Sequence, residues 1–188
     1  MQPCIAFVAA AFIPAVALAQ SYDAAPAVQA MAVAGSAASV SASMDVAASP
    51  SVVWSTLIDC ANATRFMPKL ISCKVLEKGP GWEVREHRLK GGVFKPVMRN
   101  VFRADFTPGR RLAFHRVAGD WKKSEGEWRL SPIDGGKGTH VTYHTDVAVD
   151  GPVPVSWVRS AVAKGMPQSM RALRDEAVRR AGKTTDAG

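Results

Sequence analysis

Residues 71–147 carry the pattern that most constrains the fold. Segments in which every second residue is large or β-branched follow one another, and short runs of Gly, Pro and Asp separate them. The last two segments, "GEWRLSPIDGGKGTHVTYHTDV" (126–147), place Tyr143, Thr145 and Val147 on one face. This succession predicts an antiparallel meander with one buried and one solvated face.

Helical patterns flank the meander on both sides. Upstream, alternation over 40–49 predicts a first strand, and 49–68 then changes to a helical period that predicts two short helices. Downstream, apolar residues recur at helical spacing over 152–182, which predicts one long amphipathic helix kinked near Pro167. A sheet with one wet face can bury its other face only under that helix. The predicted fold class is therefore α+β: a curved antiparallel sheet of seven strands around a long C-terminal helix, with two short helices after the first strand.

The amino-terminal residues differ from the rest of the chain. Residues 1–19 contain no charged side chain, include an apolar run, and end in the small-x-small pattern Ala17-Leu18-Ala19. This pattern is typical of a cleaved signal peptide, and it predicts a secreted protein of a bacterial periplasm. Residues 20–39 are rich in Ala, Ser and Gly and lack periodicity, which predicts a flexible leader. The folded domain would then span 40–182, before a disordered tail at 183–188.

Charge and cysteine content restrict the partners. The net charge is +8 and the basic residues are scattered, so we expect at most transient contact with an anionic membrane surface. Nucleic acid is not expected as a partner after export. Cys60 and Cys73 would remain in the mature chain, where they either form a disulfide or stay as two separate buried thiols. No metal site is predicted, because no further cysteine and no close pair of histidines is available.

Four stretches match one known family in order and spacing: "ASPSVVWSTLIDCANATRFMP" (48–68), "GEWRL" (126–130), "GTHVTYHTDV" (138–147) and "VPVSWV" (153–158). Through them the chain resembles the START-like (SRPBCC) superfamily, whose fold is called helix-grip. Within it, the chain is most similar to the bacterial polyketide cyclase/dehydrase and coenzyme Q-binding family. The resemblance covers residues 40–182. It implies a START-like ligand-binding domain with a hydrophobic cavity between the sheet and the C-terminal helix.

Strand parity, combined with this resemblance, assigns the side chains expected to line the cavity. Most are apolar or aromatic; Asn100 is placed on the inner face with them, and the Tyr143 hydroxyl is a candidate anchor. The predicted ligand-binding residues are Trp54, Phe66, Met98, Asn100, Phe102, Phe114, Trp128, Tyr143, Val147, Val162, Met166 and Met170.

Two functions fit these residues. The first is a monomeric binder or carrier of a hydrophobic molecule, such as a lipid, an isoprenoid quinone or an aromatic polyketide-like compound, without a cofactor. The alternative is a cyclase or dehydratase acting on an aromatic or polyketide-like substrate, which needs an inward acid or base. Parity directs His115 and His144 outward, and His87 and His140 fall near predicted strand ends. No catalytic residue is therefore assigned, and the binder is favoured over the enzyme.

Overall fold

The computed structural model describes residues 21–33, 37–92, 95–149 and 154–185. The predicted signal peptide and the last three residues of the predicted tail lie outside these ranges. The strands are β1 (Ala27–Val33), β2 (Ala37–Val46), β3 (Leu70–Gly79), β4 (Trp82–Gly92), β5 (Lys95–Thr107), β6 (Arg111–Gly119), β7 (Trp121–Ile133) and β8 (Gly138–Val149). The helical elements are α1 (Pro50–Ile58), the 3-10 turns η1 (Ala63–Arg65) and η2 (Asp134–Gly136), and α2 (Val155–Thr185).

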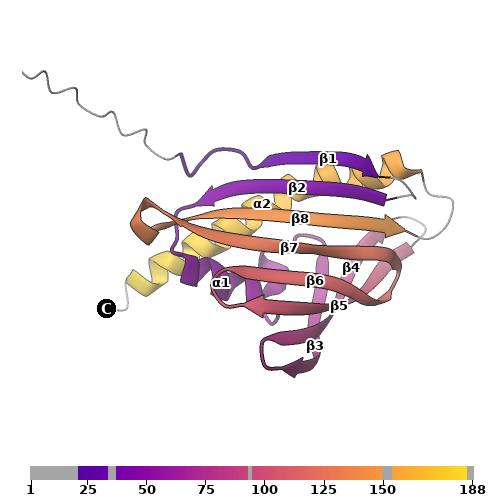
Figure 1. The fold of residues 1–188 in the computed structure, drawn as a ribbon, viewed down its shortest axis with the longest axis horizontal. Coiled ribbons are helices and arrows are strands. Elements are labelled where there is room, and N and C mark those ends of the chain that lie inside the picture. Colours follow the sequence, from indigo (N-terminus) through magenta and orange to yellow (C-terminus); the bar gives the residue numbers. More distant parts are fainter. Residues whose placement is uncertain (1–20, 34–36, 93–94, 150–153, 186–188) are drawn as a thin grey trace, which may run out of the picture.

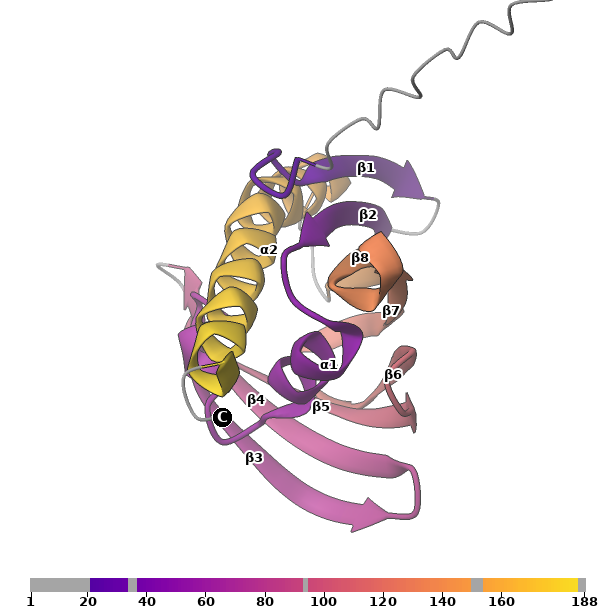
Figure 2. The same ribbon diagram turned by 90° about the vertical axis from the view of Figure 1, so that its left-hand side faces the viewer.

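The eight strands form one antiparallel sheet in the order β1-β2-β8-β7-β6-β5-β4-β3 (Figure 1). The sheet curves strongly, and α2 and α1 lie inside the curve (Figure 2). A concave face therefore looks toward the helices and a convex face looks toward solvent. The predicted α+β class, with a curved antiparallel sheet around a long C-terminal helix, is confirmed.

The predicted number of strands was wrong, because the supposed flexible leader contains a strand. Residues of β1 pair with β2 along its length, from Ala27 opposite Ser43 to Val33 opposite Ala37. The predicted end of the domain at residue 182 also differs from the structure. Helix α2 continues to Thr185 and includes the first residues of the predicted disordered tail. Pro167 lies within α2.

Strand alternation places the apolar side chains on the concave face, where α2 covers them. Met170, Leu173 and Ala177 of α2 are almost fully buried and belong to the same core cluster as Ala42 and Met44 of β2. None of the described helices is long and apolar enough to cross a membrane.

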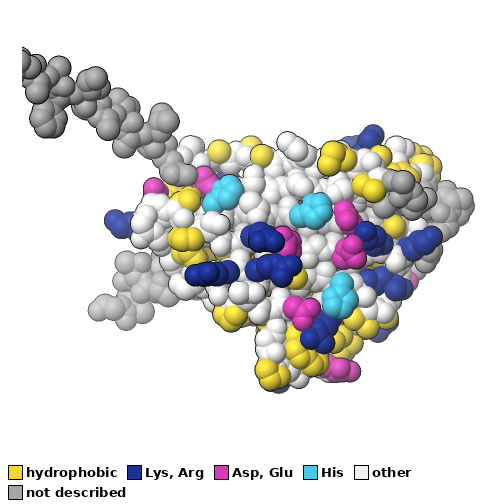
Figure 3. Space-filling model, in the orientation of Figure 1, with side chains coloured by type: hydrophobic (Ala, Val, Ile, Leu, Met, Phe, Trp, Pro, Cys, Tyr) yellow, Lys and Arg dark blue, Asp and Glu magenta, His cyan; other side chains and the backbone are white. Residues whose placement is uncertain are grey.

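The convex face is polar. Figure 3 shows Lys, Arg, Asp, Glu and His side chains spread over it. Arg111 Nε donates to Glu127 Oε2 at 2.6 Å, and exposed His115 and His144 lie near the carboxylates of Asp105 and Asp146. The outward orientation predicted for these two histidines is therefore confirmed.

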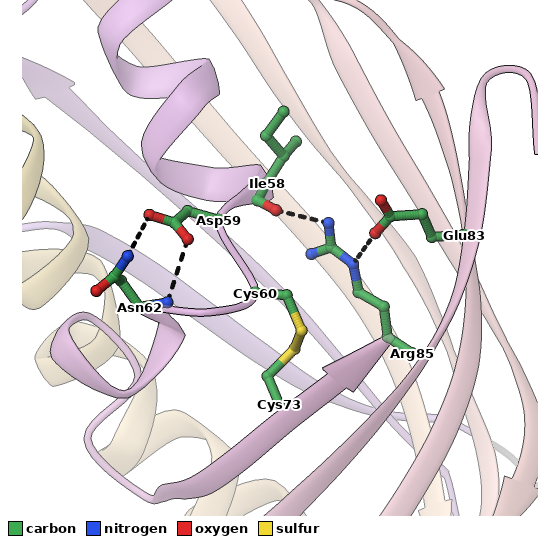
Figure 4. The surroundings of a disulfide bond; sticks show 7 residues. All are labelled: Ile58, Asp59, Cys60, Asn62, Cys73, Glu83 and Arg85. Atoms are coloured by element: carbon green, nitrogen blue, oxygen red, sulfur yellow. Dashed lines mark hydrogen bonds and ion pairs between the residues drawn. A yellow bond between two sulfur atoms is a disulfide. The ribbon is translucent and has the colours of Figure 1, made fainter. Parts of the chain in front are cut away.

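A disulfide joins Cys60, which follows α1, to Cys73 on β3, with Cα atoms 5.4 Å apart (Figure 4). Of the two alternatives left open by the sequence, the structure has the disulfide. In the same region, buried Arg85 of β4 donates from Nη2 to the Ile58 carbonyl at 2.7 Å and pairs through Nε with Glu83. The carboxy-terminal end of α1 is thus tied to the edge strand β3 and to its neighbour β4.

Candidate ligand-binding site

A row of aromatic rings crosses the middle of the concave face. Trp128 of β7 lies against Tyr143 of β8 with ring centroids 4.3 Å apart, and Tyr143 stacks on Phe114 of β6 at 6.2 Å. Phe114 contacts Phe102 of β5 edge to face at 6.1 Å, and Phe102 contacts the imidazole of His87 on β4 at 4.7 Å. Rings from five adjacent strands therefore form one continuous surface, which we call the aromatic row.

The row depends on a glycine at its centre. Gly126 of β7 pairs with Phe114 on one side and Thr145 on the other. A Cβ atom at this position would lie only 2.9 Å from Cζ of Phe114 and would also collide with the His144 carbonyl. The absence of a side chain on Gly126 therefore lets the Phe114 ring lie across β7 and reach Tyr143.

Tyr143 combines deep burial with some accessible surface. Desolvation raises the pKa of its hydroxyl to about 12, although a hydrogen bond with Thr145 acts in the opposite direction. The Thr145 hydroxyl also donates to the Glu125 carbonyl at 3.0 Å. The Tyr143 side chain is nevertheless partly exposed, as are Phe114 and Trp128. At neutral pH the phenol is protonated and able to donate a hydrogen bond.

Three polar side chains lie at the β4 end of the aromatic row, and we call them the inner polar cluster: His87, Asn100 and Arg116. His87 is directly opposite Asn100 across β4 and β5, and Arg116 of β6 is opposite Phe102. Within the part of the chain that the structure describes, three of their buried atoms have no hydrogen-bond partner: His87 Nε2, Asn100 Oδ1 and Arg116 Nε. Buried polar atoms are rarely left unpaired, so this cluster is unusual in a folded domain.

His87 lies elsewhere than the sequence predicted. Its side chain was placed near a strand end, but it lies within β4, faces the concave side and is only 8% exposed. Desolvation, together with the positive charge of Arg85, lowers its pKa from 6.5 to about 4. The concave face therefore holds a neutral imidazole at physiological pH, a group that the parity argument did not find.

The structure brings most of the predicted lining residues together. One hydrophobic cluster contains Trp54, Phe66, Phe102, Phe114, Trp128, Tyr143, Met166 and Met170. Val147 and Val162 belong to a separate small cluster with Val158, toward the beginning of α2. Met98 and Asn100 lie on β5 opposite Leu89 and His87, so the inward placement of Asn100 is confirmed. Their contact with a ligand stays a prediction.

Two hollows open on the described surface. One, of about 320 Å³, lies over β1, β2, β7 and β8; its lining includes polar residues such as Ser41 and His144, and also Tyr143 of the aromatic row. The other, of about 580 Å³, is lined by Tyr22, Ala47, Asp134 and Lys137. Among the described residues, no group of three or more His, Cys, Asp or Glu side chains could hold a metal ion.

The curved sheet closed by a long C-terminal helix is the helix-grip architecture of START-like proteins. The family model described as "Polyketide cyclase / dehydrase and lipid transport" matches residues 46–174. The chain therefore belongs to the polyketide cyclase/dehydrase and lipid transport family. No curated protein sequence matches it.

Solved structures from several organisms share the fold. The ZhuI aromatase/cyclase of Streptomyces sp. R1128 is 21% identical, with a TM-score of 0.67 over 77% of this chain and 95% of that one. A fragment of a STAR-related lipid transfer protein from Xanthomonas axonopodis is 18% identical, with a TM-score of 0.69 over 84% of this chain and 97% of that one. Human STARD10 is 12% identical, with a TM-score of 0.70 over 87% of this chain and 73% of that one. At these identities the likeness shows the fold alone.

Proposed function

We propose that this protein binds and carries a hydrophobic small molecule between the concave face of its sheet and α2. The observation that carries the proposal is the aromatic row, a ring surface on five strands that retains accessible area beneath a helix. Partly exposed aromatic side chains inside a fold contribute large apolar contact area to a ligand at little entropic cost. Met166, a partly buried residue of α2 packed against the same cluster, adds an adaptable apolar surface.

The named relatives narrow the class of ligand. One similar structure is an aromatase/cyclase and another is a lipid transfer protein. Both names refer to largely apolar molecules. A row of stacked and tilted rings favours a ligand that is itself planar over part of its length, such as an aromatic polyketide-like compound or the head of an isoprenoid quinone.

The proposed place of action is the bacterial periplasm. The signal-peptide pattern at 1–19 supports export, and the disulfide between Cys60 and Cys73 is of a kind that persists in oxidising compartments. The net charge of +8 would favour brief contact with anionic lipid head groups, from which a carrier could load.

One observation favours an alternative, a cyclase or dehydratase acting in the same place. His87 is a buried neutral imidazole at the end of the aromatic row, and Arg116 lies on β6, on the other side of β5. A neutral imidazole could accept a proton from a bound substrate, and a guanidinium could stabilise the developing negative charge on oxygen. Turnover of an aromatic polyketide mimic that is lost in a His87→Gln variant would favour this enzyme over the carrier.

The carrier is tested by identifying what the protein holds. Native mass spectrometry of protein purified from its own cells should detect a bound lipid, quinone or aromatic compound. Binding of the apolar dye N-phenyl-1-naphthylamine then tests the location. Phe114→Glu should weaken dye binding at least about tenfold, because it places a charge in the aromatic row.

The matched control is Val117→Glu, which changes an exposed residue of the same strand. It should bind the dye as the unaltered protein does. The proposed site would be contradicted if the purified protein holds no ligand and both substitutions reduce dye binding equally.

A further inference from the structure

We infer that the inner polar cluster recognises a hydroxyl group, such as a phenol, enol or alcohol, at one end of the hydrophobic ligand. The inference rests on the proposed function, because it assumes that a ligand lies along the aromatic row. It adds the polar end of the ligand and the direction in which the ligand lies.

One buried atom of each residue in the cluster is unpaired, although Nη2 of Arg116 donates to the Gly119 carbonyl at 3.1 Å, whereas comparable inward groups are paired. Arg85 has committed its guanidinium to Glu83 and to the Ile58 carbonyl. Buried Thr139 donates to the Ala48 carbonyl at 2.7 Å. Outside the cluster, every buried side-chain nitrogen and oxygen of the described residues has a partner, whereas Nε2 of His87, a residue only 8% exposed, has none. A ligand atom is a partner that would remove this cost.

The cluster also lies at one end of the aromatic row. His87 and Asn100 are directly opposite each other, and Arg116 is opposite Phe102, which is the next inward residue after Asn100 on β5. The three side chains therefore lie at strand positions next to Phe102, at the β4 end of the aromatic row, and the His87 ring contacts that of Phe102. A flat ligand lying on Phe114 and Phe102 would direct its end into this cluster.

The unpaired atoms differ in whether they donate or accept a hydrogen bond. Arg116 Nε can only donate, Asn100 Oδ1 can only accept, and His87 Nε2 does one or the other according to its tautomer. A hydroxyl oxygen both donates and accepts, so it can satisfy Arg116 and Asn100 together. A ketone would leave Asn100 unpaired, and a carboxylate or phosphate would place negative charge against its amide oxygen.

Access to the cluster requires some rearrangement. The three unpaired atoms have almost no surface that water can reach, so the ligand must displace the side chains that cover them. Because water is excluded, each hydrogen bond to the ligand would form in a low-dielectric environment, where it discriminates more strongly than at the surface.

The test uses two compounds of nearly equal shape, 2-naphthol and 2-methylnaphthalene, whose affinities are measured by equilibrium dialysis. The ratio of the two affinities is compared between the unaltered protein and an Asn100→Leu variant, so that the intrinsic hydrophobicity of each compound cancels. Loss of the hydroxyl partner should reduce the relative affinity for 2-naphthol about tenfold. Thr142→Val, on the convex face of β8, is the control and should leave the ratio unchanged.

The outcomes separate this inference from the proposed function. If both compounds bind but the ratio is the same in Asn100→Leu, hydroxyl recognition is refuted and the carrier stands. A relative affinity that favours 2-naphthoate over 2-naphthol would also refute it, in favour of an anion. If neither naphthalene binds the unaltered protein, the proposed function fails and this inference fails with it.

A second measurement needs no substitution in the cluster. The imidazole nitrogen resonances of His87 in the ¹⁵N-labelled protein should shift when 2-naphthol is added and stay in place when 2-methylnaphthalene is added. Equal shifts with both compounds, or none with either while both bind, would overturn the inference even if the Asn100 variant failed to fold.

Discussion

The buried imidazole of His87 makes the stability of the protein depend on pH in a defined window. Its pKa is lowered from 6.5 to about 4 in the folded chain, by desolvation first and by the nearby charge of Arg85 second. Above pH 6.5 the residue is neutral in both the folded and the unfolded states and has no effect. As the pH falls below 6.5, the unfolded chain takes up a proton that the folded chain refuses until about pH 4, so the free energy of unfolding decreases.

The size of the effect follows from the two pKa values. Each pKa unit of difference corresponds to about 1.4 kcal/mol. The free energy of unfolding changes with pH only between the two pKa values. At pH 5 the linkage relation gives a loss of about 2 kcal/mol relative to pH 7, rising to about 3 kcal/mol at pH 4. Carboxylates contribute little above pH 5: the most strongly shifted, Glu176, has its pKa lowered from 4.5 to about 2, mainly by hydrogen bonds from Arg179, so its contribution is lost only at lower pH.

The assay is urea unfolding at pH 7, 6 and 5, followed by tryptophan fluorescence, for the unaltered protein and a His87→Leu variant. The unaltered protein should lose about 2 kcal/mol more than the variant between pH 7 and pH 5. A His144→Leu variant on the exposed convex face keeps His87 in place and should follow the unaltered protein. Parallel curves for the unaltered protein and His87→Leu would show that His87 is not a buried neutral group, which would also remove the observation behind the enzyme alternative.

Three further predictions concern the disulfide and two glycines. Replacing Cys60 and Cys73 by Ser should lower the free energy of unfolding by about 3 kcal/mol, since the disulfide closes a sequence separation of 13; an unchanged urea midpoint would contradict this. Gly126→Ala should cost about 2 kcal/mol and weaken dye binding, because the added methyl collides with Phe114. Gly165→Ala in α2, where nothing lies within 4 Å of the added methyl, should instead stabilise the protein by about 0.5–1 kcal/mol; thermal unfolding of both variants decides.

The fold could be read from the sequence where the contrast between polar and apolar neighbours is strong. In β8, Val141, Tyr143 and Val147 alternate with polar residues, and the inward face was predicted correctly. β1 was not predicted, because "AVQAMAV" has small or apolar residues at nearly every position and neither face differs from the other. Its strand structure comes from pairing with β2, a contact that a local pattern does not contain.

The inner polar cluster was not predicted from the sequence, for a different physical reason. In β4, alternation alone would turn apolar Trp82 and Val84 inward and leave Arg85 and His87 outside. The structure has the opposite arrangement: Arg85 and His87 are buried, and Trp82 lies on the convex side with the guanidinium of Arg103 over its ring at 4.3 Å. The orientation of β4 is set by its pairing with β5, in which the inward residues include Phe102. Register, which depends on the neighbouring strand, prevails over the local preference of the sequence.

The two halves of α2 are held differently, and this decides where room for a ligand can arise. Near its carboxy terminus, Arg180 donates to Asp59 Oδ2 at 2.8 Å and to Glu176. Burial raises the pKa of Asp59, but hydrogen bonds from Asn62 and Arg180 outweigh it and keep the carboxylate charged. The disulfide that follows Asp59 extends this attachment to β3 (Figure 4). Before Pro167 none of the described side chains forms a salt bridge to another element, and Met166 remains partly exposed, although Val158 is buried against Ala38 and Val147. We therefore expect a displacement of α2 that admits a ligand to the aromatic row to come from its amino-terminal half.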